Sequence, residues 1–301
     1  MSPLDKLTIV VVTHNSETFI TACLDHLKRL GQLSRTVVVD NHSRDRTPSL
    51  LEAYRGEARI VRNDRNTGYG AGCNRGAAER PAEYVLFMNP DAFPAEGVIE
   101  RLVAYLDAHP RAGAASCRLL DPDGGVQPSC RHFLRPSIVV WRLLAVFLPL
   151  AQRRIGRVYL MSDEDRGRDH CVPWLTGAFL MLRRAAFERA RGFDERYFLY
   201  CEDTDLCLRL AKDGWTVDFV PSTGDTSHTH QHQSRRPRLS RLPFVHLGSV
   251  LRFIWTHRAY LKAVAAAPDG TAAASQGGDS AAPGGGAGRA PSVPDRTGTL
   301  R

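Results

Sequence analysis

Short apolar runs and amphipathic stretches follow one another along the first third of the chain. Residues 7–12 (LTIVVV) form a continuous apolar run rich in β-branched side chains, the pattern of a parallel strand buried on both faces. After the polar residues 13–16, apolar side chains recur at helical spacing through residues 19–27. The sequence therefore opens with a predicted strand, loop and helix.

The same succession repeats further along the chain. Predicted strands lie at 36–41, 58–62 and 83–91, and predicted helices at 71–79 and 96–106, with one more helix opened by Thr47 as N-cap and Pro48 as first helical residue. Strands that alternate with helices form βαβ units, so we expect an α/β fold: a Rossmann-like open, mostly parallel sheet with helices on both faces. Ligands of such sheets bind at the carboxyl ends of the strands.

The alternation weakens beyond residue 112. We expect a strand at 112–120, a turn at 121–125, a mostly apolar strand at 172–184, a helix near 202–212 and a strand at 215–221. Residues 268–301 are rich in Ala, Gly, Ser, Pro and Thr and have too few large apolar side chains to form a core. This last segment is predicted to be a disordered tail.

Positive charge is concentrated in two stretches that contain no acidic residue. Residues 124–162 hold six arginines, and residues 226–268 hold six arginines and one lysine. The formal net charge is +8 and these stretches contribute 13 positive charges, so the remainder of the chain is net −5. Both stretches include apolar segments, at 131–157 and 243–264, and no motif that reads nucleic acid accompanies them. We expect contact with an anionic membrane surface and no nucleic acid partner.

Cysteine usage and hydropathy bear on where the protein works. Seven cysteines, an odd number without a CxxC pair, favour a reducing environment and no disulfide framework. The longest apolar stretch, 138–151, has 14 residues and contains Arg142, whereas a spanning helix needs about 20. The first apolar run follows Asp5 rather than a basic segment, unlike a signal peptide. We expect a cytoplasmic protein, peripheral on the inner face of the cell membrane.

Polar residues follow two of the predicted strands. Asp40 and Asn41 end the second strand, where a carboxylate can accept hydrogen bonds from a nucleotide base or a ribose hydroxyl. The alternative is a turn in which Asp40 and Asp45 cap the next helix. Residues 89–91 (NPD) follow the strand YVLFM, where Asp91 can bind Mg2+ or Mn2+ beside a phosphate or help to start the next helix.

A glycine-rich loop, NTGYGAGCNRG at 66–76, opens the third predicted helix. It is not a dinucleotide fingerprint, because Cys73 and Arg75 stand where GxGxxG requires glycine, and it is not a Walker A motif. Backbone N–H groups at such a helix start can hold a phosphate. Close packing of the helix on its neighbours explains the glycines equally well.

Three carboxylates crowd into four positions at Glu202, Asp203 and Asp205, between apolar flanks. Because like charges repel, at least one of them is expected to have a raised pKa, which is the setting for a general base. Helix capping is the alternative for one of the three.

Three histidines alternate after the last predicted strand, at positions 228, 230 and 232. In an extended chain their side chains project to one side, where they can bind a metal or a phosphate. A solvated histidine cluster is the alternative.

Taken together, seven motifs in order carry a resemblance over roughly residues 6–262. They are VVVTHNS, VVVDNHSRDRT, NTGYGAGCNRG, VLFMNPD, PWLTGAFLMLRR, GFDERYFLYCEDTDLCLRL and the late histidine cluster. In these motifs the sequence resembles family 2 glycosyltransferases, inverting enzymes with a GT-A fold, and within them the bacterial rhamnosyltransferase-like group. The chain departs from the family's usual Asp-x-Asp motif by having Asn89 at its first position.

The resemblance implies roles for individual residues. Asp203 of the pair with Glu202 would be the catalytic base, and Asp91 with a late histidine, preferably His228, would bind the metal. The donor nucleotide would contact Thr13, Asn15, Asp40, Asn41, Asn66, Gly68, Asn74 and Asn89. The acceptor side would include Trp174, Thr176, Gly177 and Asp205, with a strand core as the alternative for Trp174.

The function implied is that of a hexosyltransferase dependent on Mg2+ or Mn2+. It would move a sugar, with L-rhamnose as one candidate, from a dTDP- or UDP-linked donor to a lipid-linked or cell-envelope glycan acceptor. Residues 1–115 would form the nucleotide-sugar-binding half, and residues 116–267 the acceptor half of the same GT-A domain, with its C-terminal helices on the acceptor side. A non-catalytic nucleotide-sugar- or polyanion-binding protein is the alternative, but its mark would be a broken Glu-Asp motif, and this motif is intact. No pattern indicates an oligomeric state.

Overall fold

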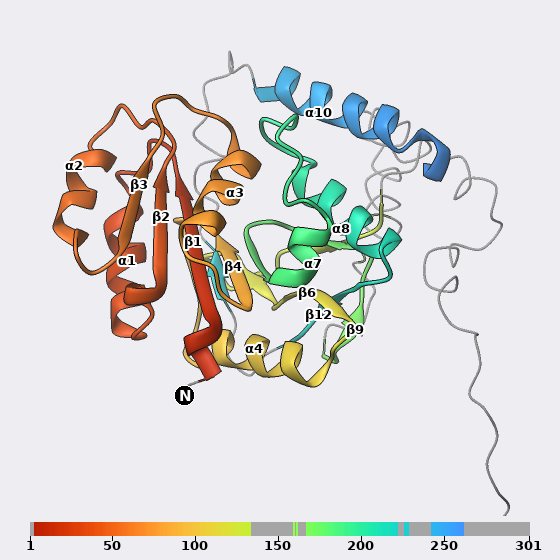
Figure 1. The fold of residues 1–301 in the computed structure, drawn as a ribbon, viewed down its shortest axis with the longest axis horizontal. Helices are drawn as coiled ribbons and strands as arrows, with labels where there is room; N and C mark the ends of the chain where they lie inside the picture. The colour runs from red at the N-terminus through yellow and green to blue at the C-terminus, as the bar shows by residue number, and fades with distance from the viewer. Residues whose placement is uncertain are drawn as a thin grey trace, which may run out of the picture.

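The computed structural model describes residues 3–133, 159, 161, 167–221, 226–228 and 242–261 (Figure 1). Several expectations fall outside these residues: most of the basic apolar segment 131–157, the histidines at 230 and 232, and the tail 268–301. Within the described part of the chain, no helix is both long enough and apolar enough to span a bilayer.

An eight-stranded sheet forms the centre of the fold, in the order β3-β2-β1-β4-β11-β6-β12-β9. In that order the strands are Arg59–Arg62, Thr36–Asp40, Leu7–Thr13, Tyr84–Met88, Phe179–Arg183, Ala112–Ser116, Thr216–Phe219 and His170–Cys171. Six strands share one direction, while β11 and β9 run the opposite way. The prediction of an open, mostly parallel sheet is confirmed, and strands from both predicted halves contribute to it.

Helices cover both faces of this sheet. They are α1 (Ile20–Arg29), α2 (Thr47–Leu51), α3 (Tyr69–Glu79), α4 (Val98–Ala108), α7 (Arg184–Arg189), α8 (Glu202–Lys212) and α10 (Leu242–Thr256), with short 3-10 turns at Pro3–Lys6, Leu33–Arg35 and Glu52–Tyr54. Figure 1 shows α10 along one edge of the molecule, beyond α8, and α4 at the opposite edge.

Alternation along β1 explains the two layers of helices. Ile9 and Val11 point into a core that includes side chains of α1 and α4, whereas Val10 and Val12 point into a second core with α3, α7 and α8. All four valine and isoleucine side chains are buried. A strand buried on both faces needs a continuous apolar run, which is why LTIVVV shows no polar alternation.

Two small sheets complete the architecture. In one, β13 (Thr226–His228) lies between β5 (Ala92–Phe93) and β7 (Leu119–Leu120). In the other, β10 (Trp174–Leu175) pairs with β8 (Cys130–Arg131). The strand expected at 172–184 is therefore two strands in different sheets. They are separated at residues 176–178, where backbone N–H groups bond to Ser129 and Asp203 instead of to a neighbouring strand.

The start of α2 differs by one residue from the prediction. Thr47 is the first helical residue rather than the N-cap, and its backbone N–H donates to Asp45 Oδ1 at 3.0 Å. The capping role proposed for Asp45 as an alternative is thus what the structure shows. The hydroxyl of Thr47 instead accepts a hydrogen bond from the backbone N–H of Ser16.

Candidate active site

The carboxyl ends of three parallel strands meet at one edge of the sheet. Thr13, the last residue of β1, lies opposite Asp40, the last residue of β2. The chain leaves β4 through residues 89–91, and the backbone N–H of Asn89 donates to the carbonyl of Ala178 at 2.9 Å. Because β11 is antiparallel to β4, the segment 176–178 enters at this same edge. Motifs that are far apart in the sequence therefore surround one location.

Thr13 and Asp40 are almost fully enclosed at this edge. The backbone N–H of Ser43 donates to Asp40 Oδ1 at 3.0 Å, so part of the carboxylate holds its own turn. The hydroxyl of Thr13 has no hydrogen-bond partner among the described residues. Asn15, in contrast, is exposed with a φ of 53°, and its Oδ1 accepts the backbone N–H of Arg44 at 2.8 Å.

Asn41 organises the loop that begins at Asn63. Its Nδ2 donates to Asn66 Oδ1 at 3.0 Å and to the carbonyl of Gly68 at 2.9 Å. Its Oδ1 accepts hydrogen bonds from Asn63 Nδ2 and from the backbone N–H and hydroxyl of Thr67. The side chain is buried, so it shapes the loop rather than standing free for a ligand.

The glycines of the loop permit close backbone packing. Gly68 has a φ of +92°, and a Cβ on it would lie 2.3 Å from the carbonyl oxygen of Phe198. A Cβ on Gly72 would lie 2.8 Å from Val12, and one on Gly76 would lie 2.4 Å from Val10. Of the two interpretations of this motif, close helix packing is what the structure shows for Gly72 and Gly76.

Asn74 lies on α3, and both the nitrogen and the oxygen of its side-chain amide form hydrogen bonds with a neighbouring turn. Its Nδ2 donates to the carbonyl of Phe193 at 2.9 Å and to Glu195 Oε1 at 3.0 Å, and its Oδ1 accepts the backbone N–H of Phe193 at 2.9 Å. This residue joins α3 to the turn that follows α7, and contact with a donor nucleotide stays a prediction.

Asp203 is a partly exposed carboxylate with both oxygens oriented by hydrogen bonds. Its Oδ2 accepts the backbone N–H of Gly177 at 2.9 Å, and its Oδ1 accepts the backbone N–H of Thr204 at 2.7 Å. The residue lies in the first turn of α8, where the helix dipole favours a negative charge. The carboxylate is thus held in one place and still reachable from outside.

Glu202 differs from Asp203 in its surroundings. Only 6% of Glu202 is exposed, and its Oε2 has no hydrogen-bond partner among the described residues. Burial, with the neighbouring charge of Asp203, raises the pKa of Glu202 well above its ordinary value. Burial also raises the pKa of Asp203, while hydrogen bonds from Gly177 and Thr204 and the charge of Arg131 act in the opposite direction. Hydrogen bonds and the arginine charge thus favour the ionised form of Asp203, whereas burial and the charge of Asp203 disfavour the ionised form of Glu202.

The turn before this pair has an uncommon backbone conformation. Tyr200 and Cys201 have φ values of 70° and 66°, in the left-handed region that non-glycine residues rarely adopt. Strain of this kind persists where surrounding contacts fix the backbone, and it is frequent at functional sites. It turns the chain sharply from residues 193–198 into α8, which brings Asp203 to Gly177.

The acceptor-side residues fall into two groups. Gly177 contacts Asp203 directly: its N–H donates to Asp203 Oδ2, and its carbonyl accepts the hydroxyl of Tyr69 at 2.7 Å. Thr176 is partly exposed beside it. Trp174 is only 4% exposed, and its Nε1 donates to the carbonyl of His132 at 2.9 Å. Trp174 is therefore packed in the strand core, and a role on the acceptor side stays a prediction.

Asp205 does not face an opening. It is 1% exposed; Arg209 Nε donates to its Oδ2 at 2.7 Å, and His257 Nε2 lies 2.7 Å from its Oδ1. A carboxylate with both oxygens engaged and no exposed surface is unavailable to a substrate. In this structure Asp205 is therefore engaged by Arg209 and His257 rather than by a neighbour of Asp203, and a contribution to the acceptor side stays a prediction.

Asp91 has the properties of a ligand for a hard cation. It lies beyond the end of β4, is only partly exposed, and burial raises its pKa to about 6. The backbone register of β5 and β13 sets His228 opposite Ala92, the residue after Asp91. Among the described residues no three His, Cys, Asp or Glu side chains form a ready metal cluster. A carboxylate oxygen here fits Mg2+ or Mn2+, with substrate phosphates completing the coordination.

Sequence reasoning missed several residues that build the site. Tyr69, between two glycines of the loop, joins α3 to Gly177, and a lone aromatic in such a loop was a usable signal. Arg131 lies 5.2 Å from the ring centroid of Trp174 and contributes positive charge near Asp203. Nothing in the local sequence distinguishes Arg131 from the other arginines of its stretch.

Solved glycosyltransferase structures share this fold, the GT-A fold. The structure of GalNAc-T7 with UDP, GalNAc and Mn2+ aligns with a TM-score of 0.54 at 13% identity, covering 75% of this chain and 44% of that one. The mannosyltransferase PcManGT from Pyrobaculum calidifontis, solved with GDP-Man and Mn2+, gives 0.52 at 20% identity over 88% and 76% of the two chains. The chain spans less than two thirds of the GalNAc-T7 structure.

The sequence comparisons are more specific. Residues 8–190 match the profile of glycosyl transferase family 2, and the chain belongs to that family. Residues 166–233 match a profile described as the N-terminal domain of galactosyltransferase. The chain is 32% identical to an N-acetylglucosaminyl-diphospho-decaprenol L-rhamnosyltransferase of Mycobacterium tuberculosis, over 86% of this chain and 87% of that one. It is 27% identical to the rhamnosyltransferase WbbL of Escherichia coli, over 82% and 91%. The predicted resemblance to rhamnosyltransferase-like members of the family is confirmed.

Proposed function

We propose that this glycosyltransferase moves a sugar from a nucleoside-diphosphate donor to a lipid-linked acceptor with inversion at the anomeric carbon. The observation that carries the proposal is the state of Asp203. It is a reachable carboxylate with a raised pKa, oriented by Gly177 and Thr204 at the edge where the parallel strands end. A single positioned base is the catalytic group that an inverting transfer requires.

In this reaction Asp203 acts as a general base and accepts one proton. Its carboxylate accepts the proton of the acceptor hydroxyl as that oxygen bonds to the anomeric carbon of the donor sugar. The bond between the anomeric carbon and the phosphate oxygen breaks at the same time, and the nucleoside diphosphate leaves with the electron pair. Glu202 is buried beside Asp203, and its raised pKa favours the protonated form, which would not compete for this proton.

The donor side is assigned to the residues that line the strand ends. Among the described residues the hydroxyl of Thr13 has no partner and one oxygen of Asp40 is not used by its turn, so we assign both to the base or ribose. Asn15 and Asn89 lie at the same edge. Asn41, Asn66, Gly68 and Asn74 contribute by fixing the loop and its neighbouring turn.

A divalent cation, Mg2+ or Mn2+, is assigned to Asp91 and His228. Such a cation neutralises the charge that develops on the departing diphosphate. Asp91 offers a hard oxygen ligand whose raised pKa reflects burial, and the strand register supports His228 as its neighbour. The Mn2+ in the structures of two related folds is in keeping with this assignment.

The donor and acceptor are assigned by the similar proteins. Two relatives are rhamnosyltransferases, and the name of one gives a diphospho-decaprenol carrier. We assign L-rhamnose as the donor sugar, carried on dTDP, and a prenyl-diphosphate-linked glycan as the acceptor. The enzyme would then work at the cytoplasmic face of the membrane, as a peripheral protein, and contribute to cell-envelope polysaccharide. Residues 1–115 would supply the donor side and 116–267 the acceptor side.

A ligand panel followed by a transfer assay tests the proposal. The thermal midpoint is measured with dTDP-, UDP- and GDP-sugars, with and without Mn2+, because a ligand that binds the folded state raises it. Transfer from dTDP-L-rhamnose to N-acetylglucosaminyl-diphospho-prenol is then followed by mass spectrometry of the lipid product. Metal-dependent stabilisation by a dTDP-sugar and a rhamnosylated product are expected. A protein that no nucleotide sugar stabilises, and that forms no product, contradicts the proposal.

A further inference from the structure

Helix α10 has two faces with opposite surroundings. On the inner face Ser249 and Phe253 are buried, as is His257 directly after the helix, and Phe253 belongs to the core shared with α3, α7 and α8. These residues recur every four positions and so line one side of the helix. This inner face, with the partly buried Val250 and Ile254 beside it, attaches α10 to the core.

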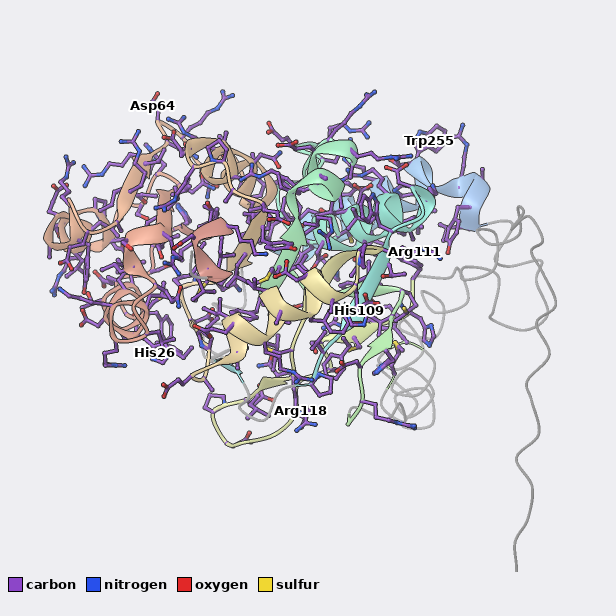
Figure 2. All side chains as sticks on the ribbon, turned by 60° about the horizontal axis from the view of Figure 1, so that its bottom comes forward. His26, Asp64, His109, Arg111, Arg118 and Trp255 are labelled. Atoms are coloured by element: carbon purple, nitrogen blue, oxygen red, sulfur yellow. The ribbon has the colours of Figure 1, made fainter. Side chains whose placement is uncertain are left out.

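The outer face carries a stripe of large apolar side chains open to solvent. The outer stripe, as we call it, consists of four residues: Phe244, Leu247, Leu251 and Trp255. They are 75%, 54%, 58% and 71% exposed, respectively. At about 100° per residue they fall within an arc of about 80°, opposite the inner face, and extend about 16 Å along the helix. Figure 2 shows the labelled Trp255 at the outer edge of the molecule. Isolated exposed apolar residues are common, but an aligned stripe of four marks a contact surface.

The charges beside the outer stripe identify the kind of surface that it contacts. Arg252 and Arg258 on the same segment are exposed, and the Arg258 guanidinium lies 4.8 Å from the ring centroid of Trp255. No acidic residue occurs anywhere from 226 to 268, while that stretch holds seven basic ones. Helices that lie in a bilayer interface have this composition: Trp, Phe and Leu on one side, basic residues along the flank and few acidic residues. Acidic side chains would be repelled by anionic headgroups, so their complete absence favours a membrane surface. A protein partner would not require that absence.

We infer that the outer stripe of α10 is a membrane-docking surface that inserts into the headgroup region of an anionic bilayer, with Arg252 and Arg258 at the phosphates. The inference deepens the proposed function and rests on it in one respect, the lipid-linked acceptor. The docking surface itself is assigned from the exposure and charge of α10.

Contacts of the inner face connect this surface to the catalytic turn. Ser249 Oγ donates to the carbonyl of Leu199 at 2.8 Å, and the ring of His246 lies 4.9 Å, edge to face, from that of Tyr200. His257 Nε2 lies 2.7 Å from Asp205 Oδ1, one half-turn of α8 beyond Asp203. A helix held on the bilayer by its outer face therefore holds the catalytic base at a set height above the lipid. This arrangement suits an acceptor whose reacting sugar protrudes from the membrane.

Vesicle binding by the full chain tests the docking surface without any substrate. Sedimentation with phosphatidylcholine vesicles is compared with and without phosphatidylglycerol, at low and high salt. The test variant is L247E/L251E, which sets two charges into the outer stripe. The control is A104E/A108E, which makes the same charge change with the same spacing at exposed positions of α4, at the opposite edge of the molecule (Figure 1). Thermal midpoints of both variants are measured to show that they fold.

The expected results separate the two variants. The wild-type chain and A104E/A108E should sediment with anionic vesicles at low salt, and L247E/L251E should bind at least about tenfold more weakly. Tryptophan fluorescence should shift to the blue on binding, and the shift should be lost in Trp255→Phe. Equal binding of L247E/L251E and the control overturns the inference. A wild-type dimer that L247E/L251E converts to monomers also overturns it, because the stripe would then be covered by a second copy.

Activity distinguishes this inference from the proposed function. L247E/L251E should transfer sugar to a short-chain, water-soluble acceptor at the wild-type rate and lose transfer to the long-chain acceptor in vesicles. Loss of transfer to both acceptors by L247E/L251E but not by A104E/A108E would mean that the stripe serves catalysis itself and would overturn the docking role. Absence of transfer by the wild type would contradict the proposed function and leave the vesicle-binding result in force.

Discussion

Replacing Asp203 by Asn removes the charge of the assigned base while keeping its size. In the wild type both carboxylate oxygens accept backbone N–H groups, from Gly177 and from Thr204. An amide has one oxygen, so one of these N–H groups would face an NH2 group and lose a bond worth about 1.5–3 kcal/mol. Removing a buried charge whose burial raises the pKa of Asp203 acts in the opposite direction. The two effects act in opposite directions, so Asp203→Asn should still fold cooperatively, which its thermal midpoint checks.

The effect on turnover should be much larger than the effect on stability. Loss of a positioned general base costs about 10²–10⁴ in rate, which is about 3–5 kcal/mol of transition-state stabilisation. Binding of the nucleotide sugar should be unchanged, because the proton acceptor touches the acceptor hydroxyl rather than the nucleotide. The expected result is a fall in kcat with a donor Kd near that of the wild type.

Glu202→Gln is the matched comparison. Burial and the charge of Asp203 raise the pKa of Glu202 well above its ordinary value, which favours the protonated form that glutamine resembles. We expect Glu202→Gln to keep kcat within about tenfold of the wild type.

The pH profile of the wild type adds a second readout. The base works only when deprotonated, and burial raises the pKa of Asp203. Activity should therefore fall with decreasing pH at a point above that of an ordinary aspartate, and Asp203→Asn should lack this limb. Rates are measured by release of the nucleoside diphosphate. An Asp203→Asn enzyme with nearly full kcat and an unchanged pH profile, or a Glu202→Gln enzyme that is the inactive one, refutes the assignment of Asp203 as the base.

Three further predictions concern packing, the buried network and the metal. Gly76→Ala should lower the free energy of unfolding by about 1–3 kcal/mol, because the new Cβ would lie 2.4 Å from a β1 valine. Gly248→Ala, with open space around it, should raise the free energy of unfolding by about 0.5–1 kcal/mol. Urea unfolding measures both. His257→Ala should cost about 2–3 kcal/mol by removing a partner of the buried Asp205 carboxylate, and an unchanged thermal midpoint would contradict that network. Asp91→Asn should abolish the Mn2+-dependent part of donor binding in calorimetry while leaving the metal-independent part, and an unaltered Mn2+ dependence would exclude Asp91 as the ligand.

The α/β class and the edge of the sheet followed from local pattern. Residues 7–12, 36–40 and 84–88 are mostly apolar on both sides of the chain, the pattern of strands in the centre of a parallel sheet. Once those strands were parallel, the residues after them had to share an edge. Thr13, Asp40 and Asp91 could therefore be placed at one edge from the sequence. The sequence also predicted a raised pKa for the crowded carboxylates, and the pKa values of Glu202 and Asp203 are both raised.

Tertiary structure decided which residue of each motif is exposed to a ligand and which is bonded within the protein. Asp203 and Asp205 stand two positions apart in the same acidic cluster, yet the first faces Gly177 and the second is enclosed by Arg209 and His257. Helical rotation separates them by about 200°, and only the position of α10 determines what meets the buried side. Asn41 and Asn74 are likewise polar residues in functional motifs whose hydrogen bonds are taken up by the protein itself.

What the sequence determined by itself is the set of elements and the chemistry at their ends, because strand burial and helical spacing are local properties. The break at residues 176–178 and the exposure of the outer stripe of α10 depend on contacts between segments far apart in the chain. An apolar residue at helical spacing is expected in a core wherever a partner exists. Only the packing of α10, with its core-facing side on Ser249, Phe253 and His257, shows that the other apolar side is left for the outside.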